Sequence, residues 1–174
     1  MSQAATDSPV LTAIFNRRSV RHFMEAPVDK APVMKALLAA SWAPSGLNNQ
    51  PWRFGIIRDP ELKARLGALT RYTNVIKSAS VLVAFFLDKD SSYDYVKDCQ
   101  AVGASIENFL LAIHAQDLGA VWIGEILKNK DEVRRILELP ERLELMAVVA
   151  VGHPAHRSQS SHRRPVEELV LFER

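Results

Sequence analysis

The stretch APSGLNNQPW, residues 43–52, interrupts an apolar, helix-like segment and leads into a strand-like one. Pro44 and Gly46 break the helical pattern, and the side chains that follow are rich in hydrogen-bonding groups, namely Ser45, Asn48, Asn49 and Gln50. Asn and Gln side chains offer both a carbonyl acceptor and an amide donor, which suits a planar heteroaromatic ligand. The same composition is typical of a solvated turn, so the loop by itself leaves both interpretations open.

The segments on either side of this loop predict an α+β domain. Helices are expected at residues 10–15, 30–42, 60–69, 98–118 and 130–137, and strands at 53–57, 81–87, 120–124 and 145–151, with a further candidate strand at 168–172. Helices and strands do not alternate strictly, which favours an α+β fold in one domain spanning residues 1–174.

Candidate capping residues predict where three of the helices begin or end, and the long helix has an unusual composition. The candidate caps are Thr6, Asp7 and Ser8 before Pro9, then Asp29, and Gly119 at the end of the long helix. Within that helix, residues 101–115 are apolar nearly all round. Such a helix is buried on most faces. In a chain of this size, the pattern predicts packing against a second copy.

Composition excludes several classes of protein. The chain has 174 residues, of which 48% are apolar and 24% charged, as is ordinary for a soluble globular domain. Its net charge of +2 predicts no general attraction to nucleic acid or to a membrane. The single cysteine, Cys99, rules out an intramolecular disulfide and fits a cytoplasmic protein. The first ten residues do not resemble a signal peptide, and no apolar run approaches the roughly 18–20 residues of a membrane span.

Two basic clusters are candidate phosphate-binding groups. The first contains Arg17, Arg18, Ser19 and Arg21, and the second contains Arg163 and Arg164. Arginine forks and a serine hydroxyl suit a phosphate group. Solvated surface charge and nucleic-acid binding are the alternative interpretations of either cluster, and neither cluster is specific by itself.

Other motifs of catalysis and cofactor binding are missing from the sequence. There is no G-x-G-x-x-G after a strand, no Walker-type phosphate loop and no nucleophile elbow. The spacing of His153, His156 and His162 matches no common zinc signature, so no metal site is expected. Cys99 has no local signature of an activated thiol, and Glu107 and His114 read as a polar contact within an apolar interface.

Several separated pieces together resemble the flavin-dependent nitroreductase family. These are RRSVRHF (17–23), APSGLNNQPW (43–52), ENFLLA (107–112), LGAVWIG (118–124) and VGHP (151–154), followed by Arg163, Arg164 and Pro165. Their order and spacing cover nearly the whole chain. The resemblance implies a nitroreductase-like α+β fold, with a mixed or mostly antiparallel sheet flanked by helices, in an intertwined homodimer that holds FMN at its interface.

The resemblance also implies a role for each site residue. Arg17, Arg18 and Ser19 would hold the FMN phosphate together with Arg163 and, less closely matched, Arg164. Arg21 would approach the N1/O2 edge of the flavin, and Ile123 and Gly124 would lie near N5. Pro44, Ser45, Asn48 and Gln50 would reach the flavin from the partner subunit. The tail, from about residue 160 to residue 174, would embrace that partner.

The function implied is that of an FMN-dependent oxidoreductase. Hydride would pass from NAD(P)H through flavin N5 to nitroaromatics, quinones or related acceptors in a ping-pong cycle, with no catalytic side chain beyond the cofactor. The alternatives are a flavin-using specialist of the same fold, such as a reductive dehalogenase or flavin-cleaving enzyme, and a phosphate- or nucleic-acid-binding module. The segment 88–98 is short where larger relatives carry a helical insertion, and Tyr93 and Tyr95 are candidates for a short lid or for exposed loop aromatics.

Overall fold

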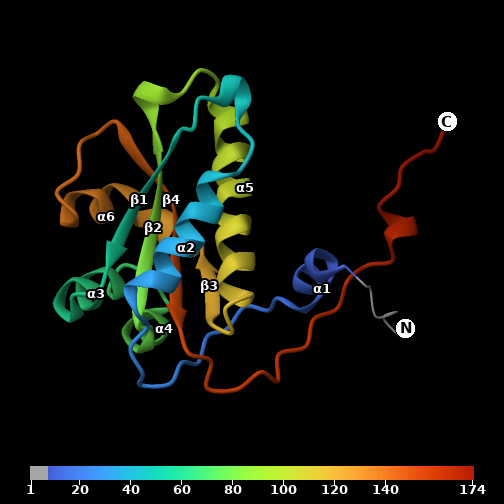
Figure 1. Ribbon diagram of the computed structural model, residues 1–174. Helices are drawn as coiled ribbons and strands as arrows, with labels where there is room; N and C mark the ends of the chain where they lie inside the picture. The colour runs from blue at the N-terminus through green and yellow to red at the C-terminus, as the bar shows by residue number, and fades with distance from the viewer. Residues whose placement is uncertain (1–7) are drawn as a thin grey trace.

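A four-stranded antiparallel sheet forms the centre of the computed structural model, which describes residues 8–174 (Figure 1). The strands are β1 (Trp52–Ile57), β2 (Val81–Asp88), β3 (Gly119–Ile123) and β4 (Leu143–Gly152), in the order β1-β2-β4-β3. The helices are α1 (Pro9–Asn16), α2 (Lys30–Ser41), α3 (Pro60–Gly67), α4 (Thr73–Ser78), α5 (Tyr95–His114) and α6 (Lys130–Ile136). The expected α+β class is confirmed, and every pairing in the described sheet is antiparallel.

Strand β2 is buried on both faces because it supplies two separate cores. Val81, Val83, Phe85 and Leu87 enter the core that contains α2 and α5. Leu82, Ala84 and Phe86 alternate with them and enter the core that contains α3, α4 and α6. A strand that is covered on both faces reads as a continuous apolar run, which accounts for VLVAFFL in the sequence.

The long helix differs from its expected bounds. It begins at Tyr95, where the Asp94 side chain caps it by accepting a hydrogen bond from the backbone N–H of Lys97, and it ends at His114. Gly119 was expected as its C-cap, which is wrong, because Gly119 is the first residue of β3. The left-handed residue after the helix is Asp117, with a φ of 58°.

Other element boundaries also needed correction. The helix expected at 60–69 ends at Gly67, and α4 was not predicted. The candidate strand at 168–172 is wrong, since the described tail contains only the short 3-10 turn Val166–Glu168. Ser8 caps α1 with a long contact of 3.5 Å to the backbone N–H of Leu11, whereas Thr6 and Asp7 lie outside the described residues.

Two segments stand away from the body of the domain. Helix α1 buries none of its residues, and the chain after β4 runs outward to an isolated C-terminus (Figure 1). Both carry exposed apolar side chains, namely Val10, Leu11, Ile14 and Phe15 in α1 and Val166, Leu169, Val170, Leu171 and Phe172 in the tail. Across the described part of the chain, no helix has the length and apolar character needed to cross a membrane.

Candidate functional site

Residues 17–24, here called the strap, lie along β3 and the end of β4. Val20 N–H donates to the carbonyl of Ala120 at 2.9 Å, and Met24 N–H donates to the carbonyl of His153 at 2.9 Å. Between these bonds, the buried side chains of Val20 and Phe23 rest on two glycines. A Cβ atom at Gly119 would lie 2.8 Å from Val20, and one at Gly152 would lie 2.7 Å from Phe23.

This seating leaves the polar residues of the strap free to face two cavities. Arg17 and Arg18 line the first, Arg21 lines the second, and Ser19 pairs with Ala120 between them. In the RRSVRHF segment, the buried side chains of Val20 and Phe23 therefore fix the backbone, and this places the three arginines at the β3 edge of the sheet.

The first cavity, here called the basic cavity, has a volume of about 310 Å³. Its lining comprises Asn16, Arg17, Arg18, Val20, Leu110, His114, Leu118, Ala120, Arg157 and Gln159. Arg17 Nε lies 3.2 Å from Glu107 Oε1, and Arg18 Nη1 donates to the carbonyl of Phe15 at 2.6 Å. The Nε of Arg18 is buried and has no hydrogen-bond partner among the described residues. The cavity therefore has arginine donors available for an anion.

His114 reports the positive character of this cavity. Burial lowers its pKa, and the neighbouring guanidinium groups of Arg157, Arg17 and Arg18 lower it further, while Asp117 acts in the opposite direction. The imidazole is therefore uncharged at neutral pH. Glu107, which we expected to form a polar contact within an apolar interface, pairs with Arg17 of the strap.

The second cavity, here called the turn cavity, has a volume of about 230 Å³ and lies where β3 ends. Arg21, Arg71, Tyr72, Val75, Val121, Trp122, Ile123, Gly124 and Glu125 line it. Arg21 is exposed, and its side chain makes no hydrogen bond or ion pair within residues 8–174. Its guanidinium is available to a ligand beside the backbone of Ile123 and Gly124.

Glu125 fixes the backbone turn at this cavity. Its carboxylate accepts a hydrogen bond from Thr70 Oγ1 at 2.6 Å and another from Arg71 N–H at 3.2 Å. Hydrogen bonds from Lys128 and Thr70 lower the pKa of Glu125 to about 2. The carboxylate therefore stays ionised and ties the turn after β3 to the chain before α4.

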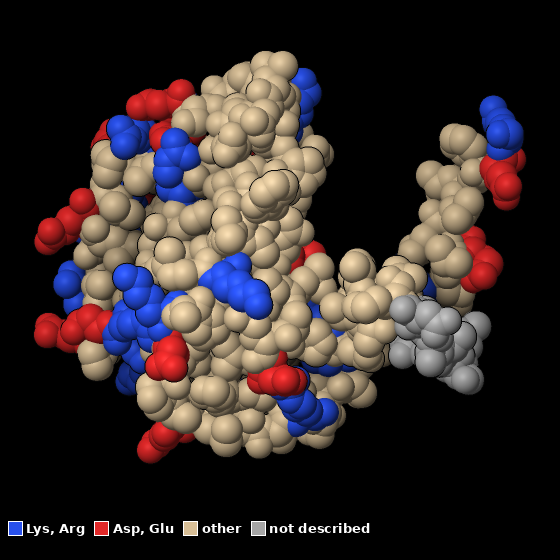
Figure 2. Space-filling view, viewed as in Figure 1, with Lys and Arg blue, Asp and Glu red and all other residues tan. Residues whose placement is uncertain are grey.

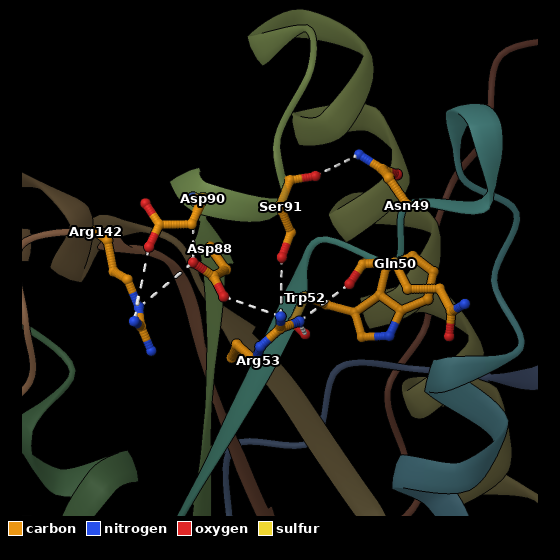
Figure 3. Close-up of polar contacts among 8 residues, drawn as sticks. All are labelled: Asn49, Gln50, Trp52, Arg53, Asp88, Asp90, Ser91 and Arg142. Atoms are coloured by element: carbon orange, nitrogen blue, oxygen red, sulfur yellow. Dashed lines mark hydrogen bonds and ion pairs between the residues drawn. The ribbon is translucent and has the colours of Figure 1, made fainter.

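The loop 43–52 is held by contacts to residues between the end of β2 and the first turn of α5, some of which are drawn in Figure 3. Asn49 Nδ2 donates to the carbonyl of Ser91 at 3.0 Å and to Asp98 Oδ1 at 2.8 Å. Arg53 donates to the carbonyl of Gln50 at 3.0 Å and pairs with buried Asp88 at 2.9 Å (Figure 3). Because both hydrogen bonds of the Asn49 amide group go to residues of the same chain, Asn49 stabilises the conformation of the loop.

The other polar side chains of this loop face outward. Asn48 and Gln50 are exposed, and both have positive φ, as does Leu47 between Gly46 and Asn48. Pro44 and Ser45 line a shallow depression beside Tyr93 and α5. Of the two lid candidates, Tyr93 thus contacts the loop at Gly46, and Tyr95 donates to Glu144 at 3.1 Å.

The candidate residues therefore fall into separate groups within one chain. The strap arginines and the turn at Ile123 and Gly124 share the β3 edge, whereas Pro44, Ser45, Asn48 and Gln50 lie on the loop beside α5. Arg163 and Arg164 are exposed on the tail and line neither cavity. Sequence reasoning missed Arg157, Arg71 and Glu125, because each stands in a segment without a recognisable motif.

Groups for side-chain catalysis are sparse in the described structure. Burial raises the pKa of the Cys99 thiol, which keeps it protonated and poorly nucleophilic. No group of three or more His, Cys, Asp or Glu residues within the described range is arranged to hold a metal ion. The arrangement is instead that of a binding site with a fixed cationic edge.

Comparison with known proteins identifies the family. The nitroreductase family model matches residues 14–75 and 68–153, and the chain belongs to this family. An Archaeoglobus fulgidus protein named as an NADH dehydrogenase/NAD(P)H nitroreductase is 32% identical over 147 residues, covering 83% of this chain and 84% of that protein. The iodotyrosine deiodinase of Thermotoga neapolitana is 28% identical over 163 residues, covering 79% of this chain and 84% of that protein.

A solved structure agrees with the fold. The crystal structure of a Desulfovibrio desulfuricans protein, named as a nitroreductase and in complex with FMN, has a TM-score of 0.92 and 47% sequence identity. The match covers 97% of this chain and 99% of that one. The nitroreductase-like fold expected from the sequence is thereby confirmed.

Proposed function

We propose that this protein is an FMN-dependent NAD(P)H oxidoreductase that reduces nitroaromatics, quinones or related acceptors. The observation that carries the proposal is the placement of Arg17, Arg18 and Arg21 along the same sheet edge as Ile123 and Gly124. FMN, when bound, would supply the chemistry by accepting hydride from NAD(P)H and passing it to the acceptor. The bound FMN of the Desulfovibrio desulfuricans relative supports this choice of cofactor.

The residues present fit the phosphate end of FMN. Arg17 and Arg18 offer guanidinium donors at the basic cavity, and the buried Nε of Arg18 has no partner among the described residues. Ser19 adds a hydroxyl beside them, and Arg163 and Arg164 would approach from the tail. A phosphate dianion would accept from these donors and balance their positive charges, of which only that of Arg17 has an acidic partner in the described part of the chain, Glu107.

The turn cavity fits the flavin ring. Arg21 would place a fixed positive charge beside the edge of the ring that gains negative charge on reduction. The backbone at Ile123 and Gly124 would direct a hydrogen bond toward the reacting edge. Glu125, with its ionised carboxylate, holds that turn in place, so its part is positioning.

A homodimer would complete the site. Pro44, Ser45, Asn48 and Gln50 lie beside α5 rather than at the strap, so they would serve the flavin held by the other subunit. The surface over α2 and α5 is mainly uncharged, whereas charged side chains gather over α3 and α6 (Figure 2). Trp42 is 81% exposed at the end of α2, and the apolar tail projects from the body. These surfaces are the ones we assign to the partner.

The visible absorption spectrum tests this proposal. Purified protein should be yellow, and its flavin bands should bleach under anaerobic conditions when NADH or NADPH is added. Addition of a nitroaromatic or a quinone should restore the oxidised spectrum. Colourless protein that does not take up added FMN would contradict the proposal.

A second candidate function is a specialised reductive reaction on the same fold. The similarity to the iodotyrosine deiodinase of Thermotoga neapolitana supports it. A panel of nitroaromatics, quinones and halogenated phenols separates the two candidates. Turnover restricted to the halogenated compounds favours the specialised reaction.

A further inference from the structure

Arg157 is a third arginine at the basic cavity, and it comes from a part of the chain distant from the strap. Its Nη2 donates to the carbonyl of Asp117 at 2.6 Å and lies 3.7 Å from Asp117 Oδ1. Both contacts attach the guanidinium to the connection between α5 and β3. Arg17 and Arg18, which follow the end of α1, line the same cavity.

The segment that carries Arg157 is fastened to the strap. Ala155 N–H donates to the carbonyl of His22 at 2.9 Å, and the rings of His22 and His156 lie 5.4 Å apart. These contacts immediately precede Arg157. The position of Arg157 therefore depends on the backbone pairing of its segment with the strap, which also carries Arg17 and Arg18. Arg163 and Arg164 lie further along the exposed tail and line neither the basic cavity nor the turn cavity.

Positive charge exceeds negative charge at the basic cavity. Arg17 has one acidic partner, Glu107, whose side chain is 46% exposed. The Asp117 side chain beside Arg157 is fully exposed at 100%, so water screens that pair. Within the described residues, the side chain of Arg18 donates hydrogen bonds only to the backbone carbonyls of Phe15 and Arg17. Three guanidinium groups around one cavity match a doubly charged anion with several acceptor oxygens.

We propose that Arg157 is a ligand-binding residue that completes, with Arg17 and Arg18, a site for a phosphomonoester. The proposal rests on the proposed function for its choice of ligand. The two sources of a phosphomonoester in that reaction are the 5′-phosphate of FMN and the 2′-phosphate of NADPH. Arg17 is shared with the proposed FMN phosphate site, which favours the first source.

The test compares Arg157→Gln with the wild-type protein in three titrations. Flavin-free protein is titrated with FMN and with riboflavin, which lacks the phosphate, and binding is followed by quenching of flavin fluorescence. The Michaelis constants for NADPH and NADH are then measured on the flavin-loaded protein. Arg65→Gln, on the exposed surface of α3, is the matched control and should leave all of these values unchanged.

Loss of one charge-assisted phosphate contact should weaken FMN binding by about 10-fold or more. Riboflavin binding by Arg157→Gln should stay at the wild-type value. A higher Michaelis constant for NADPH alone, with FMN binding unchanged, would support the same site with NADPH as its source. Equal weakening of FMN and riboflavin would overturn the proposal, because Arg157 would then act on structure. Unchanged values for all ligands would also overturn it. Wild-type protein that binds neither flavin would instead contradict the proposed function.

Discussion

Asn49 Nδ2 lies 2.8 Å from Asp98 Oδ1, so the loop before β1 is joined to the first turn of α5 through a fully buried carboxylate. The other oxygen of Asp98 accepts hydrogen bonds from Ser92 Oγ at 2.7 Å and from the backbone N–H of Tyr93 at 3.0 Å. Burial by itself would raise the pKa of Asp98, but the hydrogen bonds from Asn49 and Ser92 outweigh it and the pKa is lowered. One side chain therefore sets the relative position of two segments that flank the depression at Ser45.

Replacement of this carboxylate should cost stability. In Asp98→Asn, an amide group replaces an acceptor-only oxygen, and at least one buried donor loses its partner. We expect the free energy of unfolding to fall by about 1–3 kcal/mol in urea titrations. Asp90→Asn removes a carboxylate that is 69% exposed and should change stability much less. Equal stability of the two variants would show that Asp98 does not organise the loop.

Arg17 should contribute to cofactor retention. Arg17→Ala removes a guanidinium from the basic cavity and should weaken FMN binding by about 1.5–3 kcal/mol, the range for a hydrogen bond to a charged group. Dialysis followed by the visible spectrum measures the FMN that each protein retains. The far-ultraviolet circular dichroism spectrum should not change. An FMN affinity equal to that of the wild-type protein would remove Arg17 from the site.

His114 should make stability depend on pH in the mildly acidic range. Its pKa in the folded protein is below the ordinary value of 6.5, so the unfolded chain binds more protons as pH falls through 6.5 toward the folded pKa. Stability should therefore decrease on acidification across this window and be fully retained above it. His114→Gln should flatten the dependence, as followed by thermal unfolding at pH 7.5 and at pH values below 6.5. If His114→Gln kept the wild-type pH dependence of stability, groups other than His114 would be responsible for that dependence.

The close contact between Gly119 and Val20 of the strap should leave no room for a methyl group at Gly119. In Gly119→Ala, the new Cβ atom would lie 2.8 Å from Val20, so the strap must shift. We expect a loss of about 1–3 kcal/mol in stability, as for overpacked cores, together with weaker FMN binding. Gly55→Ala in β1 is the matched control, because its Cβ atom would lie 3.6 Å from the nearest atom, at ordinary contact distance. If folded Gly119→Ala protein bound FMN as tightly as the wild-type protein, the position of the strap would not determine FMN binding.

The apolar tail should hold the proposed dimer together. Leu171 and Phe172 are 91% and 71% exposed in the single chain. A double substitution, Leu171→Asp with Phe172→Asp, should convert the dimer to a monomer in analytical ultracentrifugation. Glu173→Gln on the same segment should leave the dimer intact. A dimer that survives the double substitution would assign the contact to α2 and α5 instead.

Patterns of the sequence predicted the sheet well because its strands are buried. The runs at 81–87 and 145–151 are continuously apolar, which is typical of strands that are covered on both faces. The prediction of a strand at 168–172 was wrong because this segment is not buried in the sheet. Its apolar residues have no neighbouring strand among the described residues, so composition alone did not decide its conformation.

The candidate site was predictable only where residues stand in motifs. Arg17, Arg21 and Gly124 belong to stretches that can be read from the sequence, and the structure places them along one edge. Arg157 could not be found this way, because its place depends on the pairing of Ala155 with His22. Glu125 was missed for a similar reason, since its partner Thr70 is distant in sequence.

The seating of the strap on β3 and β4 also constrains when the site can form. Val20 and Phe23 belong to the start of the chain, but Gly119 and Gly152, on which they rest, are made much later. Contacts between residues so far apart in sequence form slowly, because a long loop must close first. The strap arginines therefore reach their place beside β3 only after most of the domain has been synthesised. A ligand that needs them should slow unfolding of the finished protein and leave the rate of folding unchanged.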